Sequence, residues 1–412
     1  MHIVIVDTTI TTPPTGGAHT FLVNLCLRLV RKGYLTSVVT QHGPDQTLLK
    51  VLEHGGVDVP ADLWHSSHLP EERARLLADW VRERDVEVYV ISASADVGWL
   101  ALPLLDPDVA AISVAHNDNN AFYEPLWHYH PFIDTAVAVS EEIQRKLVAG
   151  GMPQERVRQI PYGVEPLSEA EIEDRCTRPR DSLQPLNIAY VGRVVQEQKR
   201  VLEFVPLAAN LKSRGVPFQF HIIGDGNERE QLSRTFADSD AADCVKFWGW
   251  QTTEGVKDLL RRMDVFLLMS DYEGLPVALL EAMGHGLAPV VSRIASGNAQ
   301  LVKNEENGYL VDVGDIEGFT NRLERLANST STLRKIQRAA WEMSLEYDVS
   351  RMVDRYIRCF EDARAARFSR DYRQRTGGSY PPMPSCVSRY PFWLRKIKYQ
   401  FQTWRSGSLS EY

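Results

Sequence analysis

The chain has 412 residues, a length that corresponds to two or three domains. Its 44% of hydrophobic residues can fill sizeable cores, which excludes a wholly disordered protein. The 46 basic and 54 acidic residues give a net charge of -8, which argues against a dedicated nucleic-acid binder. Five scattered cysteines, no apolar run of membrane-spanning length and an N-terminus without a basic leader predict a soluble cytoplasmic protein.

Short apolar runs alternate with amphipathic stretches from the first residue onward. In the first 165 residues, strands are expected at 3–6, 37–40, 86–91, 111–115 and 135–139, and helices at 18–32, 71–84 and 141–149. Continuous apolar strands between helices imply a parallel sheet that is covered on both faces. Residues 1–165 are therefore predicted to form one α/β domain.

A second alternating set follows a polar, proline-containing linker at 166–186. Strands are expected at 187–191, 218–223, 245–248, 265–269 and 289–292, and helices at 201–214, 228–237, 254–262, 276–285, 317–327 and 332–346. A helix at 349–365 is expected to cross back to the first domain. Since ligands of such folds bind at the carboxyl ends of the strands, a central cleft between the two sheets is the expected site.

The strongest motif is S-D-Y-E-G-L-P-V-A-L-L-E-A-M at 270–283. Glu273 falls in the turn after a predicted strand, and Pro276 suits the first position of the following helix. The amides of Gly274 and Leu275 would then face the cleft at a helix N-terminus. Glu281 lies inside that helix, and two carboxylates at this spacing suit pairs of sugar hydroxyls. An isolated pair of this kind would more often be a surface glutamate and an ion-pair partner.

The pair is not isolated, and it resembles the E-x7-E motif of retaining glycosyltransferases of family 4. Other elements occur in that family's order, namely Gly16-Gly17, Ser140-Glu141, Pro161-Tyr162-Gly163-Val164, Val191-Gly192-Arg193 with Lys199, Gly224 to Glu228, and Asn307 to Val311. The resemblance covers residues 1–363. It implies the GT-B fold, which is α/β, with two Rossmann-like parallel-sheet domains. The first domain would face the acceptor, and residues 187–348 would bind a nucleotide sugar.

The resemblance also implies roles for single residues. Glu273 would bind hydroxyls of the donor sugar, and Glu281 would bind those of the ribose. Arg193 and Lys199 would supply fixed cations for the charge that develops on the leaving diphosphate. Read alone, these two cations are as readily an ordinary surface pair.

Further residues are assigned to the same site. Gly16 and Gly17 would permit close backbone approach to the donor, although a Gly-Gly pair is usually only a turn. Gly224 opens the turn after the second strand of the second domain. His116 ends a strand of the first domain, where the family often places a histidine beside the transferred sugar; a lone histidine is more often structural. Catalytic roles are thus expected for Glu273, His116, Arg193 and Lys199.

Three segments with a superficial metal-binding pattern are interpreted otherwise. His128-Tyr129-His130 is expected in a packed surface loop, and the D-x-D matches at 106–108 and 238–240 are expected in turns. No obligatory metal is predicted, because Arg193 and Lys199 can replace the cation. Gln300 stands where the family usually has glutamate, which leaves the inferred donor site intact.

The sequence therefore predicts a hexosyltransferase that moves sugar from a UDP- or GDP-linked donor to a glycan, polysaccharide or lipid-linked hydroxyl acceptor, with retention. Alternatives are a nucleotide-sugar epimerase, a sucrose-type synthase and a non-catalytic scaffold of the same fold. The basic, aromatic tail at 366–412 contains an amphipathic stretch at 390–405. This stretch either packs on the first domain or binds the inner face of a membrane as a peripheral contact.

Overall fold

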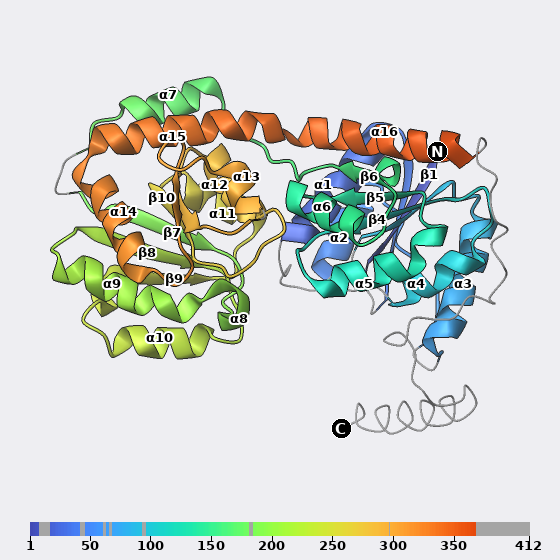
Figure 1. Cartoon of the computed structure of the whole chain (residues 1–412), viewed down its shortest axis with the longest axis horizontal. Coiled ribbons are helices and arrows are strands. Elements are labelled where there is room, and N and C mark those ends of the chain that lie inside the picture. The colour runs from blue at the N-terminus through green and yellow to red at the C-terminus, as the bar shows by residue number, and fades with distance from the viewer. Residues whose placement is uncertain are drawn as a thin grey trace.

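The structure is a computed structural model that describes residues 1–7, 17–41, 46–60, 63–65, 68–92, 96–180, 184–295 and 297–367. Two α/β domains lie side by side, each built on a six-stranded parallel sheet (Figure 1). The prediction of two parallel-sheet domains is confirmed. The amphipathic stretch at 390–405 and Gly16 lie outside the described residues.

Both sheets are wholly parallel, so all strands of a sheet run in the same direction. The first sheet has the order β2-β1-β3-β4-β5-β6, with β1 (His2–Asp7), β2 (Leu35–Thr40), β3 (Val88–Ile91), β4 (Ala110–Ala115), β5 (Thr135–Ala138) and β6 (Val157–Gln159). The second has the order β12-β11-β10-β7-β8-β9, with β7 (Leu186–Val191), β8 (Phe218–Ile223), β9 (Val245–Gly249), β10 (Val265–Leu268), β11 (Ala288–Ser292) and β12 (Tyr309–Val311). The strand order places β7, β8 and β10 next to one another in the centre of the second sheet.

Helices cover the faces of both sheets. The first domain contains α1 (Gly17–Arg31), α2 (Gln46–His54), α3 (Pro70–Glu83), α4 (Asp96–Ala101), α5 (Asn120–Tyr129) and α6 (Glu141–Ala149). The remainder of the described chain contains α7 (Glu169–Thr177), α8 (Gln196–Lys199), α9 (Phe204–Ser213), α10 (Arg229–Ala237), α11 (Thr253–Leu260), α12 (Val277–Gly284), α13 (Gly297–Leu301), α14 (Ile316–Asn328), α15 (Thr330–Ser344) and α16 (Val349–Arg367). None of the helices in the described residues is long and apolar enough to cross a membrane.

The central strands are buried along their whole length, which explains their composition. Every residue of β3, β4, β5 and β10 is buried. Parallel strands with helices on both faces have no solvent-facing side, so both side-chain directions must be apolar or small. The continuous Val, Ile, Ala and Leu runs of the sequence therefore report this architecture directly.

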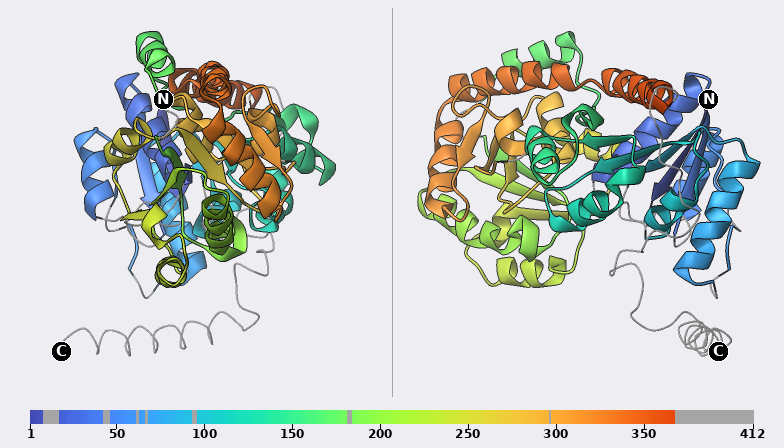
Figure 2. Two further views of the ribbon diagram at one scale, coloured as in Figure 1. Left: turned by 90° about the vertical axis from the view of Figure 1, so that its left-hand side faces the viewer. Right: turned by 45° about the vertical axis from the view of Figure 1, so that its right-hand side comes forward.

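The chain passes between the domains twice, and the two passages are hydrogen bonded to each other. The Val164 N–H donates to the Tyr347 carbonyl over 2.8 Å, and the Val349 N–H donates to the Val164 carbonyl over 3.0 Å. Helices α15 and α16 run end to end across both domains (Figure 1), separated by a 3-10 turn at Leu345–Tyr347. α16 then packs against α1 and β4, so the end of the described chain lies on the first domain (Figure 2).

The predicted linker contains a helix, α7, which is attached to the second domain. Ser168 and Glu171 form a capping box that begins this helix. Arg175 donates to the carbonyl oxygens of Gly286 at 3.0 Å and Arg261 at 3.1 Å, and to that of Met263. One guanidinium thereby binds three backbone carbonyls of the second domain. The linker therefore belongs to the second domain from residue 168 onward.

Replacing Gly163 by alanine tests the contact between the two passages. A Cβ atom at this position would lie 2.4 Å from the Val349 Cα atom and 2.9 Å from its nitrogen. Because backbone atoms cannot move aside as a flexible side chain can, we expect Gly163→Ala to lower the free energy of unfolding by about 1–3 kcal/mol. Guanidinium denaturation followed by circular dichroism measures the change.

Gly255→Ala is the matched control. Gly255 lies within α11, and the nearest atoms to an added Cβ belong to the Gln251 and Thr252 side chains. Alanine is more favourable than glycine within a helix, so this variant should be as stable as the wild type or more stable. Equal destabilisation by both substitutions would contradict a special role for Gly163.

Candidate functional site

Two glycine turns at the carboxyl ends of β7 and β8 form one side of the candidate site. Gly192 follows β7 and Gly224 follows β8, and their φ angles are +157° and +134°. A Cβ atom on Gly224 would lie 1.9 Å from the Gly192 carbonyl oxygen. Only glycine therefore allows the two turns to pack. The Tyr190 hydroxyl donates to the Arg193 carbonyl over 2.5 Å and fixes the backbone that follows.

Gln198 joins the loop after β7 to the loop after β10. The Arg193 Nη2 donates to the Gln198 Oε1 over 2.8 Å, and the Gln198 Nε2 donates to the Tyr272 carbonyl over 3.0 Å. The Gln198 side chain is buried, whereas Arg193 is exposed. This glutamine was not singled out from the sequence, where it is one of several polar residues in a short helix. Its effect is to hold the Arg193 guanidinium beside the residue that precedes Glu273.

Lys199 and Glu273 form an ion pair at the same place. Their side chains are only 13% and 7% exposed, so the pair is shielded from solvent. Charges shielded in this way interact more strongly than charges in water. Burial, with a smaller contribution from the Glu273 charge, raises the pKa of Tyr190 well above its ordinary value. The structure thus brings together Arg193, Lys199 and Glu273, which the sequence analysis assigned to one site.

The loop at 271–276 touches the first domain. A Cβ atom on Gly274 would lie 2.2 Å from the His116 carbonyl oxygen, and one on Gly17 would lie 2.5 Å from a Val277 methyl carbon. A glycine from each domain therefore permits the close approach of the two domains. Pro276 is the N-cap of α12, with ψ at 106°, and not its first helical residue as predicted. The extended ψ of Pro276 delays the helix until Val277.

Glu281 lies on α12, little more than one turn beyond the 271–276 loop, and interacts with the charge of a different cation. Its burial raises its pKa to about 7, and the Lys257 ammonium opposes this increase. Lys257 itself pairs with Glu165 of the first passage between domains, at 3.0 Å. Glu273 and Glu281 therefore have different electrostatic environments. Lys199 contacts Glu273 and neutralises its charge, whereas the Lys257 ammonium only partly offsets the effect of burial on Glu281.

His116 lies at the end of β4, and both of its ring nitrogens have partners. Its Nδ1 is 2.5 Å from the Tyr162 hydroxyl, and its Nε2 is 3.1 Å from the Ser92 Oγ. Burial, assisted by the charge of His19, lowers the pKa of His116 to about 3. The imidazole is therefore neutral at physiological pH. Its backbone carbonyl, rather than its ring, makes the contact with Gly274 described above.

Ser140 and Glu141 belong to the junction between the domains. The Ser140 hydroxyl caps α6, and the Glu141 N–H donates to the Gln300 Oε1 over 3.1 Å. The Gln300 Nε2 in turn donates to the Tyr347 hydroxyl over 3.2 Å. The departure from the family pattern at Gln300 therefore lies at a contact between α13 and α6.

The D-x-D segments take part in ordinary structural contacts. Asp106 accepts a hydrogen bond from the Arg82 Nε over 2.9 Å, and the Asp240 carbonyl accepts one from Lys212. Among the residues that the structure describes, no group of three or more histidine, cysteine, aspartate or glutamate side chains could hold a metal ion. These segments lie away from the contacts that connect Arg193, Lys199 and Glu273.

The prediction of a loop at 128–130 is wrong. Helix α5 continues through Tyr129, which is buried, and a 3-10 turn begins at His130. His130 Nδ1 lies 2.9 Å from the Trp127 carbonyl. The aromatic residues that suggested a packed loop instead continue the helix and pack its end.

Each half of the chain matches a known protein-family model. Residues 15–166 match the family model Glycosyltransferase Family 4, and residues 185–329 match Glycosyl transferases group 1. The chain is 37% identical over 209 residues to the amylovoran biosynthesis glycosyltransferase AmsK of Erwinia amylovora, covering 49% of each chain. It is 30% identical over 256 residues to the putative colanic acid biosynthesis glycosyltransferase WcaL of Escherichia coli, covering 58% of this chain and 61% of that one. The chain thus spans about half to three-fifths of the length of these relatives.

Solved structures share the two-domain architecture. HepE of Anabaena in complex with UDP-glucose superposes with a TM-score of 0.71 at 17% identity, covering 88% of this chain and 100% of HepE. The lipopolysaccharide outer core galactosyltransferase WaaB superposes with a TM-score of 0.67 at 19% identity, covering 88% of this chain and 99% of WaaB. The two family matches and these superpositions show that the chain adopts the GT-B fold.

Proposed function

We propose that the protein is a retaining hexosyltransferase that moves a sugar from a nucleotide diphosphate sugar to a hydroxyl acceptor. The observation that carries this proposal is the gathering of Arg193, Lys199 and Glu273 at the carboxyl ends of β7 and β10, beside the first domain. Two cations and a carboxylate at one place suit a ligand that carries both phosphates and sugar hydroxyls. The names of the relatives, an amylovoran biosynthesis glycosyltransferase and a putative colanic acid biosynthesis glycosyltransferase, support the same conclusion.

The donor would be held mainly by the second domain. Arg193 and Lys199 would contact the diphosphate, and Glu273 would leave its ion pair with Lys199 to accept hydrogen bonds from sugar hydroxyls. The backbone at Gly274 and Leu275 would contribute amide donors near the N-terminus of α12. Glu281 would accept hydrogen bonds from the ribose, while Gly16, Gly17 and Gly224 would permit close approach of backbone to the donor.

Transfer would proceed on one face of the sugar. The bond between the anomeric carbon and the diphosphate oxygen breaks, while the acceptor hydroxyl forms a new bond to that carbon from the same side. The hydroxyl proton passes to the departing phosphate oxygen. Arg193 and Lys199 stabilise the negative charge that develops on the diphosphate. These fixed cations are already in place before the reaction begins. His116 would lie beside the transferred sugar.

The relatives narrow the expected substrates. HepE was solved with UDP-glucose and AmsK acts in amylovoran biosynthesis, so a UDP-hexose donor and a polysaccharide or lipid-linked acceptor are proposed first, with GDP-linked donors second. Because two protein cations face the diphosphate, no obligatory metal is proposed. Peripheral attachment to the inner face of the membrane through 390–405 remains part of the proposal.

Calorimetric titration with UDP and GDP, followed by incubation with UDP- and GDP-hexoses, tests the function. A transferase binds one of the diphosphates and releases free nucleotide slowly without acceptor and faster with it, and EDTA leaves the rate unchanged. An epimerase would release an isomerised sugar nucleotide, and a scaffold would release nothing. Absence of binding to every nucleoside diphosphate would exclude the proposal.

Glu273→Gln tests the sugar-binding carboxylate. The amide keeps the size of the side chain but cannot accept two charged hydrogen bonds, so we expect the turnover rate to fall by about 100-fold. The unfolding midpoint should be unchanged. Glu254→Gln, an equivalent change at an exposed position of α11, is the control and should transfer sugar at the wild-type rate. Wild-type turnover in Glu273→Gln would remove Glu273 from the site.

Arg193→Ala tests the contact with phosphate. The exposed guanidinium donates to Gln198 and leaves other donors available, so its loss should weaken binding of the nucleoside diphosphate by about tenfold or more. Binding of the corresponding nucleoside should hardly change. Arg262→Ala, at an exposed position after α11, controls for the loss of one positive charge. Equal loss of affinity for both ligands would contradict the assignment.

The pH dependence of nucleotide binding tests Glu281. Its folded-state pKa is raised from 4.5 to about 7, so the free protein carries this side chain protonated below about pH 7. If ribose hydroxyls prefer the carboxylate, binding at lower pH must expel a proton. We therefore expect affinity to fall as the pH falls from 8 to 6.

Glu281→Gln is measured at each pH as the reference, because the ratio of affinities cancels titration of the ligand phosphate. The ratio of wild-type to variant affinity should decrease over this range. A constant ratio would show that Glu281 does not titrate with binding.

A further inference from the structure

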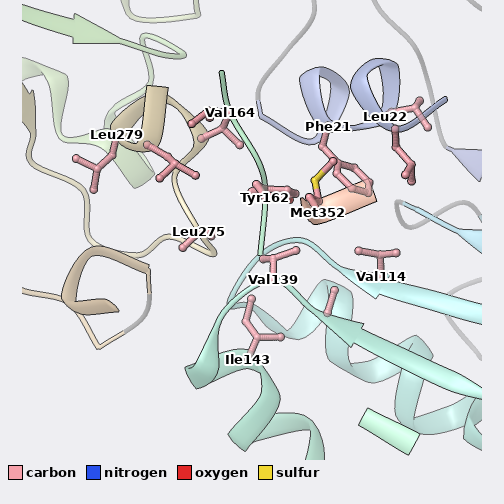
Figure 3. Packing of buried hydrophobic residues seen from close by; sticks show 14 of the residues in the cluster. Phe21, Leu22, Val114, Val139, Ile143, Tyr162, Val164, Leu275, Leu279 and Met352 are labelled. Carbon is pink, nitrogen blue, oxygen red and sulfur yellow. The ribbon is translucent and has the colours of Figure 1, made fainter. Parts of the chain in front are cut away.

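Tyr162 connects the first passage between the domains to His116. Its hydroxyl lies 2.5 Å from the His116 Nδ1, and the two rings stack with centroids 5.8 Å apart and planes 10° apart. Both side chains are buried. In Figure 3 Tyr162 lies on the first passage between the domains, close to Phe21 of α1 and Met352 of α16. Tyr162 is therefore fixed by elements of the first domain while its backbone leads toward the second.

Both partners are uncharged, which limits how the proton can be placed. Burial lowers the pKa of His116 to about 3, and burial with the Asp7 charge raises the pKa of Tyr162. A neutral imidazole has one N–H donor and one acceptor nitrogen. A phenol is a stronger hydrogen-bond donor and a weaker acceptor than the aliphatic Ser92 hydroxyl, so the two contacts favour the proton on the nitrogen near the Ser92 Oγ. That nitrogen is Nε2, so the phenol of Tyr162 donates to Nδ1.

The backbone of His116 is the part of the first domain that touches the 271–276 loop. A Cβ atom on Gly274 would lie 2.2 Å from the His116 carbonyl oxygen and 3.1 Å from the Asn117 Cα atom. Glu273 directly precedes Gly274 in this loop. Hydrogen bonds that fix the buried His116 ring therefore restrain the backbone that lies against the loop carrying Glu273.

We infer that Tyr162 is a positioning residue, whose hydroxyl selects the Nε2–H tautomer of His116 and so holds the His116 backbone against the 271–276 loop. The inference rests on the proposed function, since it gives this loop the donor sugar. Two residues after Tyr162, Val164 bonds to the second passage. The hydrogen bond to His116 thus joins the passage between the domains to the surface where sugar transfer is proposed.

Tyr356 provides a matched control within the same aromatic group. Its ring centroid is 5.3 Å from that of Phe21, the same separation that Tyr162 has from Phe21. The Tyr356 hydroxyl is buried and has no hydrogen-bond partner among the residues described. Tyr356→Phe therefore removes the same atom from the same cluster without breaking a hydrogen bond.

The tautomer is measured directly by nitrogen NMR of the full chain with selectively labelled histidine. The His116 signals are identified by their loss in His116→Gln. We expect an acceptor-type Nδ1 and a protonated Nε2 in the wild type and in Tyr356→Phe, and a mixed or reversed pattern in Tyr162→Phe. Ser92→Ala should keep the wild-type tautomer, because the phenol still donates to Nδ1. An unchanged pattern in Tyr162→Phe, or a reversal in Ser92→Ala, would overturn the inference.

Steady-state kinetics provide the second measurement. Tyr162→Phe should lower kcat for sugar transfer by about 10- to 100-fold and leave the donor KM nearly unchanged, because donor contacts remain but the reacting groups are misplaced. Tyr356→Phe should retain the wild-type kcat. If the wild type transfers sugar and Tyr162→Phe is equally fast, the inference alone fails. If the wild type transfers no sugar, the proposed function fails, and the NMR measurement still decides whether Tyr162 selects the tautomer.

Discussion

The two hydrogen bonds around Val164 constrain the whole arrangement of the molecule. They join the first passage between the domains to the second, so neither passage can change direction independently of the other. Gly163 makes this pairing possible because there is no room for a side chain against the Val349 backbone. The contacts of Gly274 with His116 and of Gly17 with Val277 depend on this relative placement of the domains.

The charged side chains at the proposed donor site have partners within the protein when no ligand is bound. Lys199 and Glu273 neutralise each other in a shielded position, and Gln198 occupies one side of the Arg193 guanidinium. A buried charge without a partner would be strongly destabilising, so the two groups stabilise each other until a diphosphate and a sugar replace them. On the proposed function, donor binding would therefore exchange one set of charged contacts for another instead of creating all of them anew.

The sequence predicted the two sheets well because parallel strands that are buried on both faces leave continuous apolar runs. The structure also brings Arg193, Lys199 and Glu273 together, since the segments that carry them follow β7 and β10 and the carboxyl ends of parallel strands lie together. Their role at a donor site stays a prediction. Helix α7 was not recognised within the linker, although Ser168 and Glu171 form a capping box that was present in the sequence. Gln198 and the partners of His116 could not be predicted, because they depend on contacts between segments far apart in the chain.

The attachment of α7 by Arg175 determines where the protein can be divided. A division at residue 186, where the predicted linker ends, would separate the second domain from a helix whose Arg175 guanidinium donates to three of its backbone carbonyls. The division that keeps α7 with the second domain instead falls between Val164 and Ser168. In the second passage between the domains, the corresponding division falls near Asp348. Chimaeras that exchange first domains between relatives should therefore be joined at these two points, which lie next to each other in space although 184 positions separate Val164 from Asp348 in the sequence.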